Sequence, residues 1–198
     1  SGQIPDKNIL QPVSNYKKIV PTEEEKNAFK NIFAKIGTSY WDRVSGTEAK
    51  NALKILSNDR LLSCATDSQK VKLIRIATYA LDEAKADKDT PLKASLLKGI
   101  DNVVEDFTRR GKMNKLVNYL FIDISKTGTF LSNMDDWASR KISKNDKILN
   151  ATTAEQKSSM LYGLRFGYTD QRDQESIIKI MKNAVDKGQF KSVMGYWS

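Results

Sequence analysis

Histidine is absent from the 198 residues of this chain, which removes the commonest general base of enzymes. Ser-His-Asp triads, Cys-His pairs and H-E-x-x-H zinc sites are excluded with it. Cysteine occurs once, at Cys64, so neither an intrachain disulfide nor a cysteine-based zinc site can form. An enzyme made from this chain would have to use carboxylates, Lys, Tyr or Arg. We expect a reducing compartment, no catalytic residues, no metal and no cofactor.

Proline and glycine are scarce, with four and ten residues, whereas a β-sandwich needs turn residues every few positions. No apolar run is longer than about five residues, which is too short to span a membrane. Three of the four prolines lie in residues 1–21, which we interpret as an extended arm or linker. The opening Ser1-Gly2 is typical of a cleaved tag, so we expect a fragment of a larger protein.

The remaining residues, 22–198, carry the marks of helices. A capping box, Ser or Thr followed three residues later by Glu or Gln, occurs at Thr22, Ser45, Thr66 and Thr153. Apolar residues at helical spacing follow each box, and glycines such as Gly111 and Gly188 end such stretches. We therefore predict one compact all-α domain of about seven or eight helices. Residues 60–64 should form a helical turn, residues 132–142 a helix, and residues 143–152 a loop.

One stretch, SYWDRVSGTEAKNAL at residues 39–53, raises the question of an anion-binding loop. A P-loop needs a second glycine followed by Lys and Ser or Thr, and a strand before it. Gly46 has none of these. Because Ser45 and Glu48 form a capping box, we interpret the stretch as the start of a helix.

The net charge of +9 is spread along the chain, since residues 1–99 hold 17 basic and 12 acidic residues. Such a charge favours anionic partners but also aids solubility. Basic residues gather in three clusters: Lys70, Lys72 and Arg75; Arg109, Arg110, Lys112 and Lys115; and Arg140, Lys141, Lys144 and Lys147. Clusters that share a face would form an anionic-membrane or phosphoinositide site, each basic residue contributing ~1 kcal/mol.

Two considerations limit the interpretation of these clusters as a binding site. Arg109 and Arg110 are also explained as cations in the last turn of a helix, where the helix dipole favours them. Aromatic residues that could stack on bases are not interleaved with the clusters, so nucleic acid is the less favoured partner.

A second candidate site lies in YGLRFGYTDQRDQ, which places two Tyr and two Arg around a helix junction. Such residues clasp phosphates or stack on rings, and a helix N-terminus adds backbone donors. The candidate ligands for a phosphate are Tyr162, Arg165, Tyr168 and Arg172. The alternative is a structural junction, packed by Phe166 and Tyr168, with Arg172 paired to a nearby acid.

Paired carboxylates occur at Asp87 and Asp89, at Asp101 and Glu105, and at Asp135 and Asp136. Asp101 and Glu105 share a helical face at i, i+4 spacing. Histidine normally joins carboxylates in helical two-metal sites, so we interpret all three pairs as solvated surface.

The stretch YWDRVSGTEAKNALKILSND, at residues 40–59, resembles a helical domain of type IV secretion effectors of the Legionella kind. The resemblance implies delivery into a host cell, in the cytosol or at a membrane, as a targeting or partner-binding module. The resemblance implies no catalytic residues for this chain.

We therefore expect a non-enzymatic module that binds an anionic host partner, either a phosphoinositide-bearing membrane or an acidic protein surface. The expected contacts are Arg109, Arg110, Lys112 and Lys115 first, then Arg140, Lys141 and Lys144. The alternatives are a scaffold that binds a host protein through an apolar surface, and an atypical enzyme with the Arg/Tyr phosphate site.

Overall fold

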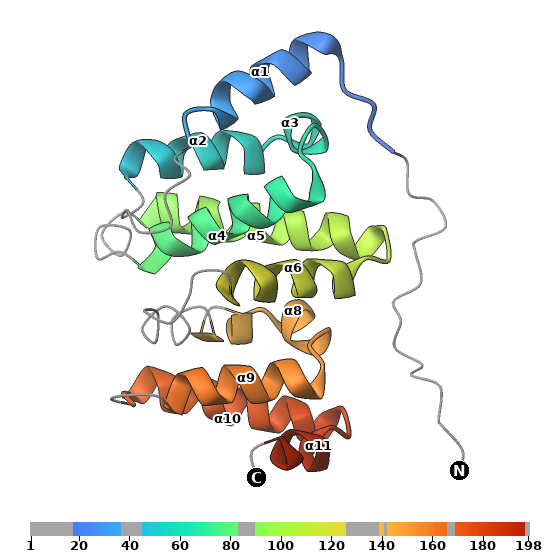
Figure 1. The fold of residues 1–198 in the computed structure, drawn as a ribbon. Helices are drawn as coiled ribbons and strands as arrows, with labels where there is room; N and C mark the ends of the chain where they lie inside the picture. The colour runs from blue at the N-terminus through green and yellow to red at the C-terminus, as the bar shows by residue number, and fades with distance from the viewer. Residues whose placement is uncertain are drawn as a thin grey trace. The chain divides into compact units, whose positions relative to one another are not determined.

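The computed structural model describes residues 18–36, 45–82, 90–125, 139–140, 142–165 and 169–196. Every regular element in these ranges is helical, which confirms the all-α class. The helices with defined bounds are α1 (Glu23–Phe33), α2 (Gly46–Leu56), α3 (Asp59–Ser63), α4 (Asp67–Asp82), α5 (Thr90–Arg109), α6 (Met113–Ser125), α8 (Asp146–Asn150), α9 (Ala154–Arg165), α10 (Gln171–Asp186) and α11 (Phe190–Gly195) (Figure 1). The chain divides into two compact units, Ser1–Leu116 and Val117–Ser198, with the division inside α6.

The predicted capping boxes begin four of these helices. At α2, the Glu48 amide donates to Ser45 Oγ at 3.2 Å, and the Ser45 amide donates to the Glu48 carboxylate at 3.1 Å. The same reciprocal pairs form at Thr22, Thr66 and Thr153. The stretch around Gly46 is thus a helix start, as expected from its sequence.

Residues 143–152 are not a loop throughout, because α8 forms within them. The Asn145 side chain caps this helix, accepting from the Ile148 amide at 3.1 Å. Ile148 and Leu149 are buried, and two apolar residues in one turn are too few to show helical periodicity. The predicted turn at residues 60–64 is confirmed by α3. Most of the predicted arm and of the helix at 132–142 lies outside the described residues.

Within the first unit, α2 lies between α1 on one side and the paired helices α4 and α5 on the other (Figure 1). Ala52, Ile55 and Leu56 are fully buried on α2, and Phe29 of α1 is nearly so. Helix α3 follows α2 and contacts both α1 and α2. The amphipathic helices of this unit therefore share one apolar core with α2 at its centre.

Gly99 permits the close approach of α5 to α2. A Cβ added to Gly99 would lie 2.7 Å from Cβ of Leu56, which is fully buried. Three residues later on α5, Asn102 Nδ2 donates to the Leu56 carbonyl at 2.9 Å, satisfying an acceptor that the end of α2 leaves without a helical partner. Packing and hydrogen bonding thus meet at the C-terminus of α2.

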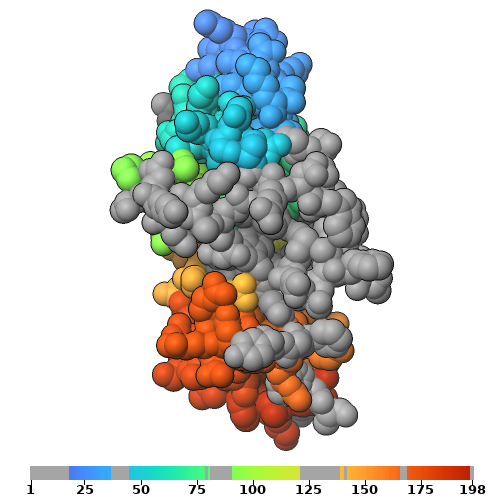
Figure 2. All heavy atoms as spheres, turned by 90° about the vertical axis from the view of Figure 1, so that its left-hand side faces the viewer, coloured from blue at the N-terminus to red at the C-terminus, as the bar shows by residue number. Residues whose placement is uncertain are grey.

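The second unit is built on α9, which α10 and α11 contact. Leu161 and Leu164 of α9, Ile180 and Ala184 of α10, and Val193 of α11 are fully buried. Helices α9 and α10 are orange to red-orange in Figures 1 and 2.

Gly188 ends α10 as the sequence indicates. It adopts a φ of 66°, and its amide donates to the Val185 carbonyl while the Gln189 amide donates to the Ala184 carbonyl at 2.7 Å. These two bonds make a Schellman motif, in which glycine is favoured because its φ is positive. Gly111 ends α5 in the same way, with a φ of 66°.

Gly99→Ala should lower the free energy of unfolding by about 1–3 kcal/mol, because the new methyl group overlaps a packed Leu side chain. Gly46→Ala is the control, since its added Cβ meets no atom within 4 Å and should leave stability unchanged or slightly higher. Urea unfolding followed by circular dichroism measures both. Equal effects of the two substitutions would contradict the close approach of α2 and α5.

Candidate functional site

The densest basic cluster is largely engaged in ion pairs within the first unit. Arg110 is half-buried and its guanidinium lies 2.9 Å from Asp67 and 2.7 Å from Asp106. Lys115 contacts the other Asp67 oxygen at 3.0 Å, while exposed Arg109 pairs with Glu105 one turn earlier. These contacts join the start of α4, the end of α5 and the start of α6.

The first and second basic clusters meet at the same place. Lys70, with a side chain only 8% exposed, reaches Asp106 at 2.8 Å. Burial alone would raise the pKa of Asp67, but the Lys115 and Arg110 contacts outweigh it and hold that pKa below its usual value. Arg110 also lies over the Phe107 ring, 4.6 Å from its centroid. The guanidinium of Arg110 thus uses its edge in the ion pairs and its plane against Phe107.

Lys112 is the member of this cluster that takes no part in these ion pairs. It occupies the turn between α5 and α6, is exposed, and forms no ion pair with any residue in the described ranges. An external anion could therefore contact Lys112 and the outer parts of Arg109 and Lys115, and the four cations are not equivalent.

The third basic cluster is divided in a similar way. Arg140 lies 2.6 Å from Asp173, a side chain only 2% exposed. Lys144 is exposed, and its carbonyl accepts a hydrogen bond from Lys179 Nζ at 3.4 Å. Lys141 lies outside the described residues.

The structure brings Arg140 and Arg172 together through two carboxylates at the start of α10. Asp170 and Asp173 form a reciprocal capping box there, with amide-to-carboxylate distances of 3.0 and 3.1 Å. Arg172 donates twice to Asp170, at 3.1 and 2.8 Å, and this contact holds the pKa of Asp170 below its usual value. The two arginines and the helix terminus are therefore occupied by the chain's own acids.

The aromatic part of this candidate site is less complete. Tyr162 and Arg165 are exposed on α9, whereas Tyr168 lies outside the described residues. The Thr169 hydroxyl donates to the Leu164 carbonyl at 3.4 Å, across the junction.

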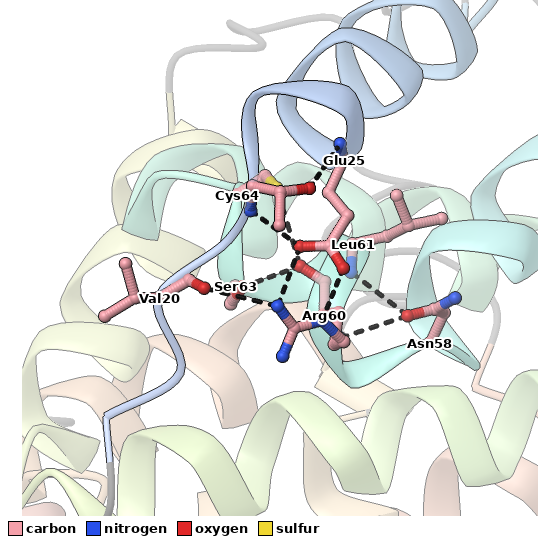
Figure 3. A network of polar contacts seen from close by, with 8 residues as sticks. Val20, Glu25, Asn58, Arg60, Leu61, Ser63 and Cys64 are labelled. Carbon is pink, nitrogen blue, oxygen red and sulfur yellow. Dashed lines mark hydrogen bonds and ion pairs between the residues drawn. The ribbon is translucent and has the colours of Figure 1, made fainter.

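Cys64 lies in a polar network that joins α1 to α3 (Figure 3). Arg60 pairs with Glu25 of α1 and donates to the Val20 carbonyl at 3.3 Å, while the Cys64 thiol donates to the Arg60 carbonyl at 3.5 Å. Burial and the negative charge of Glu25 raise the pKa of the Cys64 thiol. A raised pKa disfavours the thiolate, which is the nucleophilic form.

Lys157 is a buried cation that the sequence analysis did not single out. Its side chain is fully buried, and Nζ donates to Thr152 Oγ1 at 2.7 Å and to the carbonyls of Thr152 and Leu149 at 2.8 and 3.2 Å. It thereby satisfies carbonyls at the end of α8, a place that favours positive charge. Burial, reinforced by the charge of Lys187, lowers its pKa to about 8.

Exposed apolar side chains form a feature that the sequence analysis missed. Eight large apolar side chains are exposed in the described part of the chain, and five of them are Ile178, Val185, Phe190, Met194 and Tyr196. The signal was present in α10, where apolar residues occupy more than the one stripe that a buried face needs.

In the described ranges, no three His, Cys, Asp or Glu residues gather as a metal site requires. The pairs Asp87/Asp89 and Asp135/Asp136 lie outside the described residues. Asp101 and Glu105 are exposed, as expected. In the same ranges, no helix is both long and apolar enough to cross a membrane. Comparison of the chain with protein families, with curated proteins and with solved structures finds no match.

The buried Lys157 should make stability depend on pH between about 8 and 10.5. In that window the unfolded chain holds a proton on Lys157 that the folded chain lacks, so stability rises with pH and falls as pH drops toward 8. Relative to Lys157→Met, the wild-type free energy of unfolding should rise by about 3 kcal/mol across the window. Urea unfolding at several pH values measures this difference, with Lys182→Met as the exposed control. Parallel pH profiles for wild type and Lys157→Met would contradict the lowered pKa.

Proposed function

We propose that this chain is a non-enzymatic helical module that binds the surface of an anionic-lipid membrane. The proposal rests on which cations stay exposed once the ion pairs within the chain have formed. Asp67, Asp106 and Asp173 are drawn into half-buried or buried ion pairs, and each neutralises a cation that is itself removed from the surface. Because these pairs remove cations and acids in equal number, they leave the net charge of +9 to the rest of the chain.

Exposed cations occur in both units. Lys112 belongs to the first unit, and Lys144, Lys182 and Lys191 belong to the second. Lysines near an acidic bilayer each contribute ~1 kcal/mol, an attraction that needs no shaped pocket. Scattered exposed lysines suit a flat anionic surface better than they suit one phosphate group, which requires converging donors.

A lipid surface is favoured over an acidic protein or a nucleic acid because exposed apolar side chains accompany these lysines. Ile178, Val185 and Phe190 lie in the same helices as Lys182 and Lys191. Apolar side chains beside lysines are the composition of interfacial membrane helices. The resemblance of residues 40–59 to effector domains supports, as part of the proposal, a host-cell membrane as the target.

An enzyme built on the Arg/Tyr site is less supported. A phosphate at the start of α10 would compete with Asp170 and Asp173 for the same backbone amides, and Arg172 and Arg140 already contact these acids. The anion would have to displace carboxylates that belong to the fold.

Vesicle flotation tests this function. The chain should bind phosphatidylcholine vesicles that contain phosphatidylserine or a phosphoinositide, should not bind pure phosphatidylcholine, and should bind more weakly as salt is raised. Lys112→Glu should weaken binding by at least about fivefold. Lys50→Glu makes the same charge change at an exposed residue of α2.

Binding that does not depend on acidic lipid would overturn the proposed function. Equal losses from Lys112→Glu and Lys50→Glu would instead show that net charge alone matters, and would remove Lys112 as a contact.

A further inference from the structure

The exposed apolar side chains of the second unit concentrate at its C-terminal end. The five residues from Ile178 to Tyr196 expose between 37% and 59% of their surface. The other exposed large apolar residues in the described ranges, Val20, Leu97 and Tyr162, are spread over the rest of the chain. Single exposed apolar residues are ordinary, but a concentration of them marks an interaction surface.

Helix α10 has one buried face and, opposite it, two exposed apolar side chains. Ser176, Ile180 and Ala184 are buried against the unit, and the spacing of four residues places them on one stripe. Ile178 and Val185 are 54% and 59% exposed. They are separated by seven residues, or about two helical turns, and therefore form a second stripe. The unit's own core does not account for this stripe.

The Schellman motif leads the chain from α10 into α11, where further apolar side chains are exposed. It reverses the chain after Val185, so Phe190 begins α11 only five residues later. Phe190 and Met194 are 41% and 37% exposed, whereas Val193 is fully buried. The i, i+4 spacing of Phe190 and Met194 places both on one side of α11, a helix that contacts α10.

Lysines border the apolar residues. Lys182 is exposed one turn after Ile178, and Lys191 is exposed beside Phe190. In residues 178–196 there are four lysines and one acid, Asp186, and only Lys179 of the four has an ion pair with a described residue, Asp146. Lysines therefore outnumber acids by four to one in this segment.

We propose that α10 and α11 form a membrane-insertion edge, in which Val185, Phe190 and Met194 enter the headgroup and acyl boundary of an anionic bilayer. This inference rests on the proposed function and names the surface and the mode of binding. Lysine stems extend along the apolar layer while their ammonium groups reach the lipid phosphates. Insertion makes the binding partly independent of salt, unlike attraction by charge alone.

Charge argues for a bilayer and against a second copy of the chain as the occupant. Two copies joined through this edge would bring Lys182 and Lys191 of each toward those of the other, and like charges across an interface disfavour association. An acidic bilayer supplies the opposite charge over the whole edge.

Vesicle binding by two variants tests the edge. Val185→Ser combined with Phe190→Ser should weaken binding to phosphatidylcholine–phosphatidylserine vesicles about tenfold or more at high salt, where charge attraction is screened. Leu97→Ser is the matched control, because it removes an apolar side chain that is 48% exposed on α5 of the other unit. Circular dichroism and thermal melting of both variants, compared with wild type, check that a loss of binding is not a loss of fold.

An environment-sensitive fluorophore gives a second readout of insertion. Attached to the cysteine of a Val185→Cys variant in a Cys64→Ser background, the dye should shift to the blue and be quenched by brominated lipid when anionic vesicles are added. The same dye on a Glu155→Cys variant, at an exposed residue of α9, should change little.

The outcomes separate this inference from the proposed function. Absence of any binding to anionic vesicles would overturn both. Binding that Val185→Ser/Phe190→Ser leaves unchanged, with no dye shift at position 185, would overturn the insertion edge alone. If the wild type is a dimer and the double variant is a monomer, the edge is instead an interface with a second copy. If an acidic protein, rather than a vesicle, shields the dye at residue 185, the edge is instead a binding surface for that protein.

Discussion

Arg110 lies between two carboxylates, Asp67 and Asp106, and the organisation of the first unit depends on this contact. The three groups come from the start of α4 and the end of α5, with Lys115 of α6 joining from a third helix. Removal of one partner would leave a charge in a half-buried site, which costs far more than the loss of an exposed pair. The same contact decides the surface charge, because the cations held here are withdrawn from external anions.

The sequence predicts structure well where a few neighbouring residues determine it. Ser45 with Glu48 begins α2, and Gly188 ends α10, because capping and a positive φ are local requirements. It predicts poorly where distant residues decide. Nothing near Arg140 in the sequence points to Asp173 as its partner, and α8 is stabilised by burial of Ile148 and Leu149 rather than by a repeating pattern.

The candidate sites show the same division. The basic clusters are visible as composition, but whether Arg110 or Lys112 faces solvent depends on where α4 places Asp67. Lys157 reads as a surface residue among polar neighbours, yet the fold buries it against the end of α8. The exposed stripe of Ile178 and Val185 was readable in principle, since a helix with one buried face leaves a second apolar stripe unexplained. The division of the chain inside α6 has no marker in the sequence, because the helix continues through it.

The burial of Lys157 also sets its reactivity. An amine with a pKa near 8 has far more of its neutral, nucleophilic form at physiological pH than a surface lysine has. Yet the fully buried Nζ is hydrogen-bonded to three oxygens and closed to reagents in solution. Acylation at Lys157 therefore requires the contact between α8 and α9 to open first. The rate at which Lys157 is acylated therefore reports local unfolding of the second unit, whereas the rates of the exposed lysines report only their accessibility to the reagent.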